Sequence, residues 1–255
     1  MARITYDDET AAAFKAVREV PRDGLEHWRD AIRRHLKPVP EMTVADIGAG
    51  TGAFAATFND WFGLSILAVE PSAAMRAQIP RRPGIRVLEG DASALPLPDG
   101  SADGAWLSTV IHHIPDLEAA AREIRRVLRP GAPVLIRQGF PGRADWPGTW
   151  WVHRWFPETT RTLDTWPTVE QTCQAFAAAG FSRDGLEQIP ETYRTSLAEF
   201  LAQADTFRRA DSTMRTLTEE EFLRGKERLR RAAQDAEKTP GPQPRTSWLD
   251  LLVLR

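Results

Sequence analysis

The chain is poor in several features that would each point to a particular class of protein. Its 255 residues include one cysteine, Cys173, so no disulfide can form within it. No apolar run approaches the ~20 residues that cross a bilayer, and the first residues lack the apolar segment of a signal peptide. The formal net charge is only −2, too small to attract nucleic acid or an anionic membrane. These absences predict a cytoplasmic protein that acts on neither nucleic acid nor membranes.

What the chain does contain is an alternation of short apolar runs and helical segments. Continuous apolar runs are typical of parallel strands covered by helices on both faces. The expected strands are 43–47, 64–70, 85–89, 102–110, 133–137, 181–189 and 248–254. The expected helices among them are 53–61, 72–78, 117–128 and 168–179. The pattern predicts an α/β fold with a doubly wound, mostly parallel, seven-stranded sheet of the Rossmann-like kind.

Three segments interrupt this alternation and are expected to be helical lid insertions over the carboxyl edge of the sheet. Two capping boxes, Ser196 with Glu199 and Thr218 with Glu221, predict two helices in the last of them. The expected organisation is one domain over 1–255, with an N-terminal helical arm at 1–36, a cofactor-binding core at 43–137, an aromatic lid segment at 138–166 and a helical cap at 191–240.

A glycine-rich loop follows the first expected strand. Gly48, Gly50 and Gly52 stand at every second position, where glycine lets the backbone turn sharply and approach a ligand closely. Asp46 lies two residues before them. A carboxylate repels a pyrophosphate but tolerates an amine or a positive charge. The loop therefore indicates a nucleotide-like cofactor that is cationic at its reactive end.

The glycine-rich loop is followed by Glu70 at the end of the second expected strand and by Gly90-Asp91-Ala92 after the third. The order of these motifs, within residues 43 to 137, resembles the class I S-adenosylmethionine-dependent methyltransferases. The resemblance implies that Glu70 binds the cofactor ribose, and that Asp91 and the amide of Ala92 hold its adenine. Tyr6, Phe14 and Arg18 resemble an arm that closes over the cofactor, although the family more often has tyrosine where Phe14 stands. The residues implied to bind S-adenosylmethionine are Tyr6, Arg18, Asp46, Gly48, Gly50, Gly52, Glu70, Asp91, Ala92 and Ser108.

His112 and His113, near the end of the fourth expected strand, are the candidate catalytic residues. Open α/β sheets bind ligands at such strand ends, and histidine can take a proton near neutral pH. We expect the two side chains to point in different directions, with His112 the more favoured base. The alternative is that both only pack and hydrogen-bond. No spacing of histidines, cysteines and acids indicates a metal site.

Aromatic residues gather after the fifth expected strand and suggest where an acceptor binds. Aromatic faces bind planar rings and stabilise positive charge. The expected acceptor-binding residues are Trp146, Trp150, Trp151, His153 and Trp155. The alternative is a lid that buries its own tryptophans. The expected function is thus methyl transfer from S-adenosylmethionine to a small, aromatic or heteroaromatic molecule of natural product biosynthesis, on O, N or C.

Other functions stay open at this point. Gly48-x-Gly50-x-x-Ala53 also fits a relaxed dinucleotide-binding pattern, which would make the protein an oxidoreductase, although Asp46 and Asp91 have no role there. The same fold could bind S-adenosylmethionine and catalyse a cyclisation or rearrangement, or serve as a non-catalytic partner of another enzyme. The expected partner is a small molecule, and the chain is expected to be a monomer or a homodimer.

Overall fold

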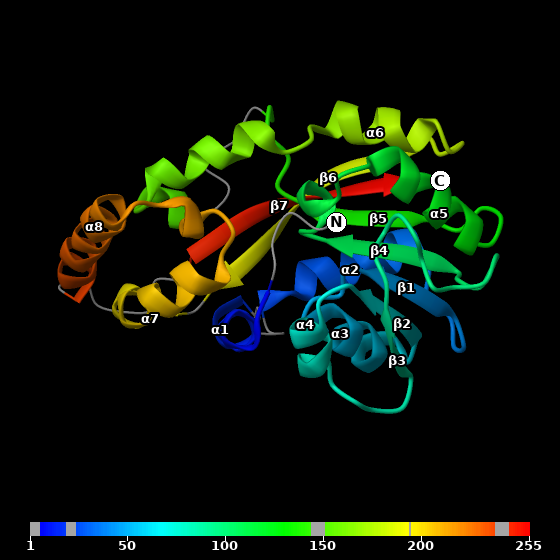
Figure 1. Ribbon diagram of the computed structural model, residues 1–255, viewed down its shortest axis with the longest axis horizontal. Coiled ribbons are helices and arrows are strands. Elements are labelled where there is room, and N and C mark those ends of the chain that lie inside the picture. Colours follow the sequence, from blue (N-terminus) through cyan, green and yellow to red (C-terminus); the bar gives the residue numbers. More distant parts are fainter. Residues whose placement is uncertain (1–5, 19–23, 144–150, 194, 238–244) are drawn as a thin grey trace.

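The computed structural model of the chain describes residues 6–18, 24–143, 151–193, 195–237 and 245–255. Its centre is a seven-stranded sheet with the order β3-β2-β1-β4-β5-β7-β6 (Figure 1). The strands are β1 (Thr43–Ile47), β2 (Ser65–Glu70), β3 (Ile85–Glu89), β4 (Gly104–Ser108), β5 (Val134–Gln138), β6 (Arg183–Tyr193) and β7 (Arg245–Leu254). β7 runs antiparallel to both of its neighbours and the other pairs are parallel. The predicted fold class is confirmed.

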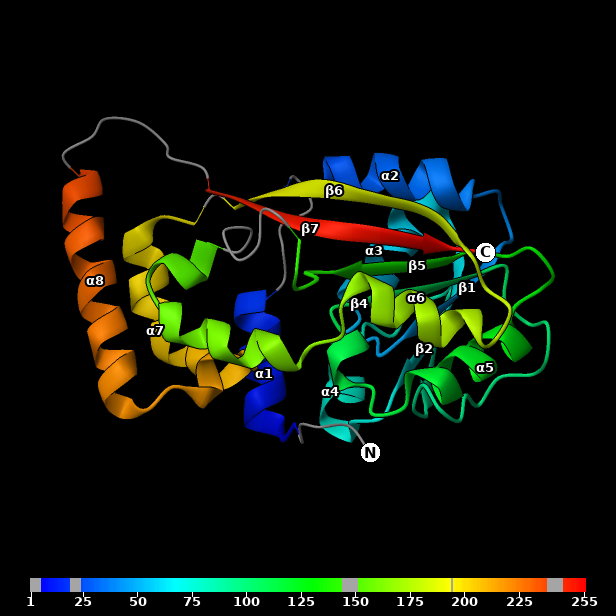
Figure 2. The same cartoon turned by 90° about the horizontal axis from the view of Figure 1, so that it is seen from above.

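Helices cover both faces of the sheet. On one face, α2 (Glu26–Leu36) and α3 (Ala53–Phe62) contribute Trp28, Ile32 and Phe58 to a buried cluster with β1, β2 and β4. On the other, α5 (Leu117–Val127) and α6 (Val169–Ala177) pack Ile124 and Phe176 against the sheet. α4 (Ala73–Gln78) begins at Ser72, whose hydroxyl accepts a hydrogen bond from the Met75 amide. Figure 2 shows these layers from above.

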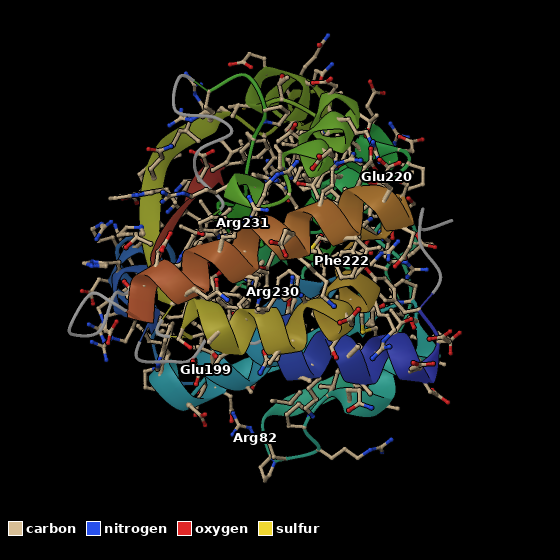
Figure 3. All side chains as sticks on the ribbon, turned by 90° about the vertical axis from the view of Figure 1, so that its left-hand side faces the viewer. Arg82, Glu199, Glu220, Phe222, Arg230 and Arg231 are labelled. Carbon is tan, nitrogen blue, oxygen red and sulfur yellow. The ribbon has the colours of Figure 1, made fainter. Side chains whose placement is uncertain are left out.

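A helical cap lies beyond the sheet. It consists of α7 (Leu197–Ala210), η5 (Met214–Thr216) and α8 (Glu219–Glu237), and α1 (Asp8–Arg18) contacts α7. Both predicted capping boxes are present at the starts of α7 and α8. Phe222 of α8 shares one buried apolar cluster with Phe200 and Phe207 of α7. Arg230 and Arg231 of α8 pair with Glu227. Figure 3 shows the cap helices with Phe222, Arg230 and Arg231 labelled. The short helices η3 (Trp151–Arg154) and η4 (Pro157–Thr165) complete this region.

Several strand boundaries differ from the prediction, and two of them, the ends of β4 and β6, affect the site. β4 ends at Ser108 and not at Val110, because Thr109 has a φ of 50° and turns the chain out of the strand. β6 continues to Tyr193, so Glu191 belongs to a strand and the cap does not begin there. The reason is a ladder with β7 that pairs Glu191 with Ser247 and Tyr193 with Arg245. β6 and β7 therefore extend past the other strands toward the cap (Figure 2).

Among the described helices, none has the length and apolar character needed to cross a membrane.

Candidate active site

The glycine-rich loop connects β1 to α3 at the carboxyl edge of the sheet. The amides of Gly48 and Ala49 donate to the carbonyl of Val69, at 2.8 and 3.1 Å, which fastens the loop to β2. Gly48 has a φ of 71°, and a Cβ there would lie 2.4 Å from Val110, so no larger residue fits. Gly50 has a φ of 55°, and a Cβ there would meet nothing within 4 Å. The backbone at Gly50 thus leaves room for a ligand to approach.

Glu70 ends β2 and faces this loop. Its Oε2 accepts a hydrogen bond from the Gly50 amide, and its Oε1 accepts one from the Ser72 amide, both at 2.9 Å. Burial raises the pKa of the Glu70 carboxyl, and the bonds from these two amides and the charge of Arg76 act against that rise. Glu70 therefore holds the loop after β1 against the start of α4.

Asp46, on β1, has a buried carboxyl group in which one oxygen lacks a hydrogen-bond partner among the described residues. The residue is 2% exposed, and its Oδ2 has no hydrogen-bond partner among the described residues. Burial, and then the negative charge of Glu70, raise the pKa of Asp46 to about 7. A positively charged group bound beside the loop would favour the ionised form of Asp46 and compensate its burial.

Replacing Asp46 with asparagine tests this protonation. Because the pKa of Asp46 is higher in the folded chain than its ordinary value of 3.8, the folded chain binds more protons than the unfolded chain between about pH 4 and pH 7. Its contribution to the free energy of unfolding therefore falls as pH rises through this window, by on the order of 4 kcal/mol. We expect urea denaturation to show this fall in the native sequence and its loss in Asp46→Asn. The same pH slope in both proteins would contradict the protonation of Asp46.

Two cavities open at the carboxyl edge of the sheet. The main cavity has a volume of about 700 Å³ and is lined by residues from the arm, the sheet and the cap. The expected site residues that line it are Tyr6, Gly48, Gly50, Glu70, Ser108, His112, His113 and His153. The second cavity, of about 590 Å³, adds Asp46 and Gly52 and lies beside α3. Both cavities share Phe14, the glycine-rich loop, Ser108 and Arg137.

The two histidines share the main cavity, contrary to the expectation that they point apart. They lie on a short 3-10 turn, η2 (Ile111–His113), and not on an extended strand, where neighbouring side chains alternate. Their ring centroids are 4.0 Å apart. His112 also stacks on Trp166, with a centroid distance of 3.9 Å and an interplanar angle of 15°. Nδ1 of His112 lies 3.1 Å from Nε2 and 3.4 Å from Oε1 of the Gln138 side chain.

Other expected residues lie elsewhere. Asp91 is exposed and accepts the Ser93 amide at 2.7 Å in a turn, and Ala92 is buried in the core, so the structure brings neither to the two cavities. Trp155 packs against the apolar cluster of the cap. Trp146 and Trp150 lie outside the described residues. For Arg18 and Trp151 only the backbone is described, at the end of α1 and the start of η3.

A buried ion pair that the sequence analysis did not identify supports the wall between the two cavities. Arg137 donates from Nε to Glu191 Oε1 at 2.7 Å and also from Nη2 to the same oxygen. Tyr193 donates its hydroxyl to Glu191 Oε2 at 2.9 Å, and Arg137 Nη1 donates to Ser108 at 3.1 Å. A charged residue at the end of the apolar strand β5 is a visible signal for Arg137. Its partner lies 54 residues later and becomes apparent only from the sheet order.

The part of the chain that the structure describes contains no group of three or more His, Cys, Asp or Glu side chains placed to hold a metal ion.

The central part of the chain is similar to known methyltransferases. Residues 45–136 match the family described as "Methyltransferase domain". Demethylmenaquinone methyltransferase of Renibacterium salmoninarum is 32% identical over 150 residues, which cover 54% of this chain and 63% of that protein. Ubiquinone/menaquinone biosynthesis C-methyltransferase UbiE of Caulobacter vibrioides is 34% identical over 142 residues, which cover 50% of this chain and 56% of that protein. The match thus spans less than two thirds of each relative.

The fold is also similar to solved structures. A protein of Anabaena variabilis, assigned as a methyltransferase of an antibiotic biosynthesis pathway, aligns over 92% of this chain and 98% of its own, with a TM-score of 0.67 and 21% identity. The structural likeness therefore includes the cap as well as the central sheet.

Proposed function

We propose that this chain, which belongs to the class I S-adenosylmethionine-dependent methyltransferases, methylates a small aromatic or heteroaromatic molecule with S-adenosylmethionine. One observation carries the proposal. The main cavity runs without a break from Glu70 and Gly50, where the family resemblance puts the cofactor, to His112 and Trp166, which can hold a flat ring.

The residues at the cofactor end fit S-adenosylmethionine. Gly50 offers open space for close approach, and Glu70 supplies a buried carboxylate that can accept hydrogen bonds from ribose hydroxyls. The unpartnered Oδ2 of Asp46, among the described residues, suits a positively charged group better than a phosphate. Tyr6 and Phe14 of the arm, whose rings meet edge to face at 6.3 Å, line the same cavity. When bound, this cofactor would supply a methyl group that a nucleophile can take from the sulfonium, with the neutral thioether as the leaving group.

The chain's contribution to the reaction is mainly alignment. Holding two reactants in line can lower a barrier by roughly 7–11 kcal/mol. Trp166 covers one face of the His112 ring and also lines the main cavity, where its indole can orient an aromatic acceptor. The argument from Trp166 for an aromatic acceptor does not depend on Trp146 and Trp150, which lie outside the described residues.

His112 is the favoured base for an acceptor that must lose a proton. A base at Nε2 requires the proton of the ring to sit on Nδ1, where the Gln138 carbonyl oxygen can accept it. The Gln138 side chain can meet either tautomer of His112, because its Nε2 and Oε1 lie 3.1 and 3.4 Å from Nδ1, and Trp166 fixes the ring plane. A positioned base contributes on the order of 10²–10⁴ in rate.

Replacing His112 with alanine should lower kcat by at least about a hundredfold while the affinity for S-adenosylmethionine stays nearly constant. The reason is that the Glu70 carboxylate bonds to the amides of Gly50 and Ser72, while His112 contacts Gln138 and Trp166. The rate at which a methylated aromatic product forms measures kcat, and calorimetry with S-adenosylmethionine measures the affinity. His113→Ala is the matched comparison, since a loss of turnover confined to His113 would assign the base to the other ring.

Product mass distinguishes the proposed reaction from its alternatives. A methyltransferase product gains one methyl group, a cyclase product is an isomer, and a non-catalytic partner gives no product. The two curated relatives described above are named as methyltransferases, so they do not favour the cyclisation or the dinucleotide-dependent reaction. The two curated relatives act in quinone biosynthesis by their names, which supports a ring as acceptor.

A further inference from the structure

The hydroxyl of Ser247 is a buried polar group that the site described above does not use. Ser247 lies on β7, is 1% exposed and lines the main cavity. Its hydroxyl oxygen has no hydrogen-bond partner among the described residues. Burying a hydroxyl without a hydrogen bond is unfavourable. A molecule bound in the cavity can supply the bond that the chain itself does not.

The order of the strands explains why this hydroxyl has no partner. β5 ends at Gln138, which stands opposite Asp250 of β7. Ser247 comes three residues before Asp250, so it lies roughly 10 Å past the carboxyl end of β5. Among the strands that the structure describes, this part of β7 pairs only with β6. Figure 2 shows β6 and β7 running past the other strands toward the cap. The side of β7 that faced β5 therefore faces the space between the sheet and the cap.

The polar residue opposite Ser247 already has other partners. Ser247 stands across from Glu191 in the ladder of β6 and β7. Oε1 of Glu191 accepts from two nitrogens of Arg137, and Oε2 accepts from the Tyr193 hydroxyl at 2.9 Å. Ser247 is thus next to a buried ion pair but takes no part in its hydrogen bonds.

The surroundings of Ser247 indicate what kind of group it can bind. Successive residues on the same face of β7 are Ser247, Leu249 and Leu251, so the serine is a polar position at the end of an apolar row. Leu249, Val110 and Trp166 line the same cavity. A serine hydroxyl offers one donor and two lone pairs. One such hydroxyl can satisfy a neutral oxygen, whereas a buried charge needs an ion pair or several hydrogen bonds.

We propose that Ser247 binds the acceptor through a hydrogen bond to a neutral oxygen, a hydroxyl or a carbonyl, carried by an otherwise apolar ring. The inference rests on the proposed function and narrows its substrate class. Ser247 is then a residue that determines specificity, because an acceptor without this oxygen leaves the buried hydroxyl unpaired.

Two matched pairs of probes and one variant test the proposal. The full chain is first saturated with S-adenosylhomocysteine, whose binding is measured by calorimetry. 2-Naphthol is then compared with 2-methylnaphthalene, and 2-acetylnaphthalene with 2-isopropenylnaphthalene, on the native chain and on Ser247→Ala. The comparison of affinity ratios cancels the different hydration of the free probes. In at least one pair we expect the ratio to shift at least about threefold against the oxygen compound in Ser247→Ala, the effect of one neutral hydrogen bond.

The matched control is Thr246→Ala, an exposed neighbour on the same strand whose side chain points to the other face of the sheet. This variant should leave both affinity ratios unchanged. The pair that responds to Ser247→Ala tells whether the oxygen is a hydroxyl or a carbonyl. Unchanged ratios in both pairs overturn the proposal.

The stability of the unliganded chain gives a second readout. Because the Ser247 hydroxyl has no partner among the described residues, Ser247→Ala should leave the midpoint of urea denaturation equal to the native value or raise it. A midpoint clearly below that of Thr246→Ala, or failure of Ser247→Ala to fold, would show that the hydroxyl supports the chain itself and would overturn the proposal.

The outcomes separate the two levels of inference. Failure of S-adenosylhomocysteine to bind contradicts the proposed function itself. Binding of S-adenosylhomocysteine without binding of any probe, or without the expected shift in Ser247→Ala, overturns only the assignment of Ser247 and of the acceptor oxygen.

Discussion

Replacing Glu191 with alanine is expected to lower the free energy of unfolding by about 3–5 kcal/mol, because it leaves the guanidinium of Arg137 buried without its partner. Glu191 is 0% exposed and accepts from two nitrogens of Arg137 and from the Tyr193 hydroxyl. Since Arg137 also supports the wall between the two cavities, we expect weaker cofactor binding as well. Urea denaturation followed by fluorescence measures the loss of stability.

Two further variants make this test specific. Glu187→Ala is the matched control, because Glu187 lies on the same strand and pairs at the partly exposed surface with Arg34 and His35. Such pairs contribute roughly 0.2–1 kcal/mol. The double variant Arg137→Met with Glu191→Leu removes both charges and should recover most of the stability. A loss for Glu191→Ala no larger than that for Glu187→Ala would show that the pair is not a buried charge pair.

Replacing Glu70 with alanine is expected to weaken the binding of S-adenosylmethionine at least about tenfold. The side chain holds the Gly50 amide in place and, in the proposed function, also accepts a hydrogen bond from a ribose hydroxyl. Each charge-assisted hydrogen bond that is lost costs ~1.5–3 kcal/mol. Calorimetry with the cofactor measures the change directly.

The neighbouring strand supplies the control for Glu70. Glu89 ends β3 opposite Glu70 in the sheet register, but its side chain is 77% exposed and pairs with Arg76. Glu89→Ala should leave the affinity within about twofold of the native chain. If Glu70→Ala binds the cofactor as tightly as Glu89→Ala, then Glu70 does not belong to the cofactor site.

The central sheet could be predicted from the sequence because its signals are local. Short segments rich in apolar and β-branched residues give β1 and β3 with the boundaries that the structure has, and side-chain caps give the starts of α5, α6 and α7. The end of β4 could not be predicted in the same way. Thr109 is β-branched and adopts a φ of 50° against its own preference, so the turn to His112 is imposed by the surrounding fold.

The candidate site was predictable where a short motif defines it and not where distant strands create it. The motif Asp46 to Gly52 and the acid Glu70 follow neighbouring strands, and the structure brings them into contact through the Gly50 amide. The ion pair of Arg137 with Glu191 depends on β7 lying between β5 and β6, which no local pattern encodes. The stacking of Trp166 on His112 likewise joins residues that are separated in sequence by α5, β5, η3 and η4.

The antiparallel strand β7 has a consequence for how the chain folds. β5 pairs on one side with β4, a nearby segment, and on the other with β7, which follows the whole cap in sequence. Contacts between distant segments form slowly because a long loop must close first. During synthesis β5 therefore remains an unprotected sheet edge, prone to pairing with other chains. The part of the sheet that carries the glycine-rich loop can therefore form before β7 is synthesised. The main cavity is completed later, because β7 contributes Ser247 and Leu249 to its lining.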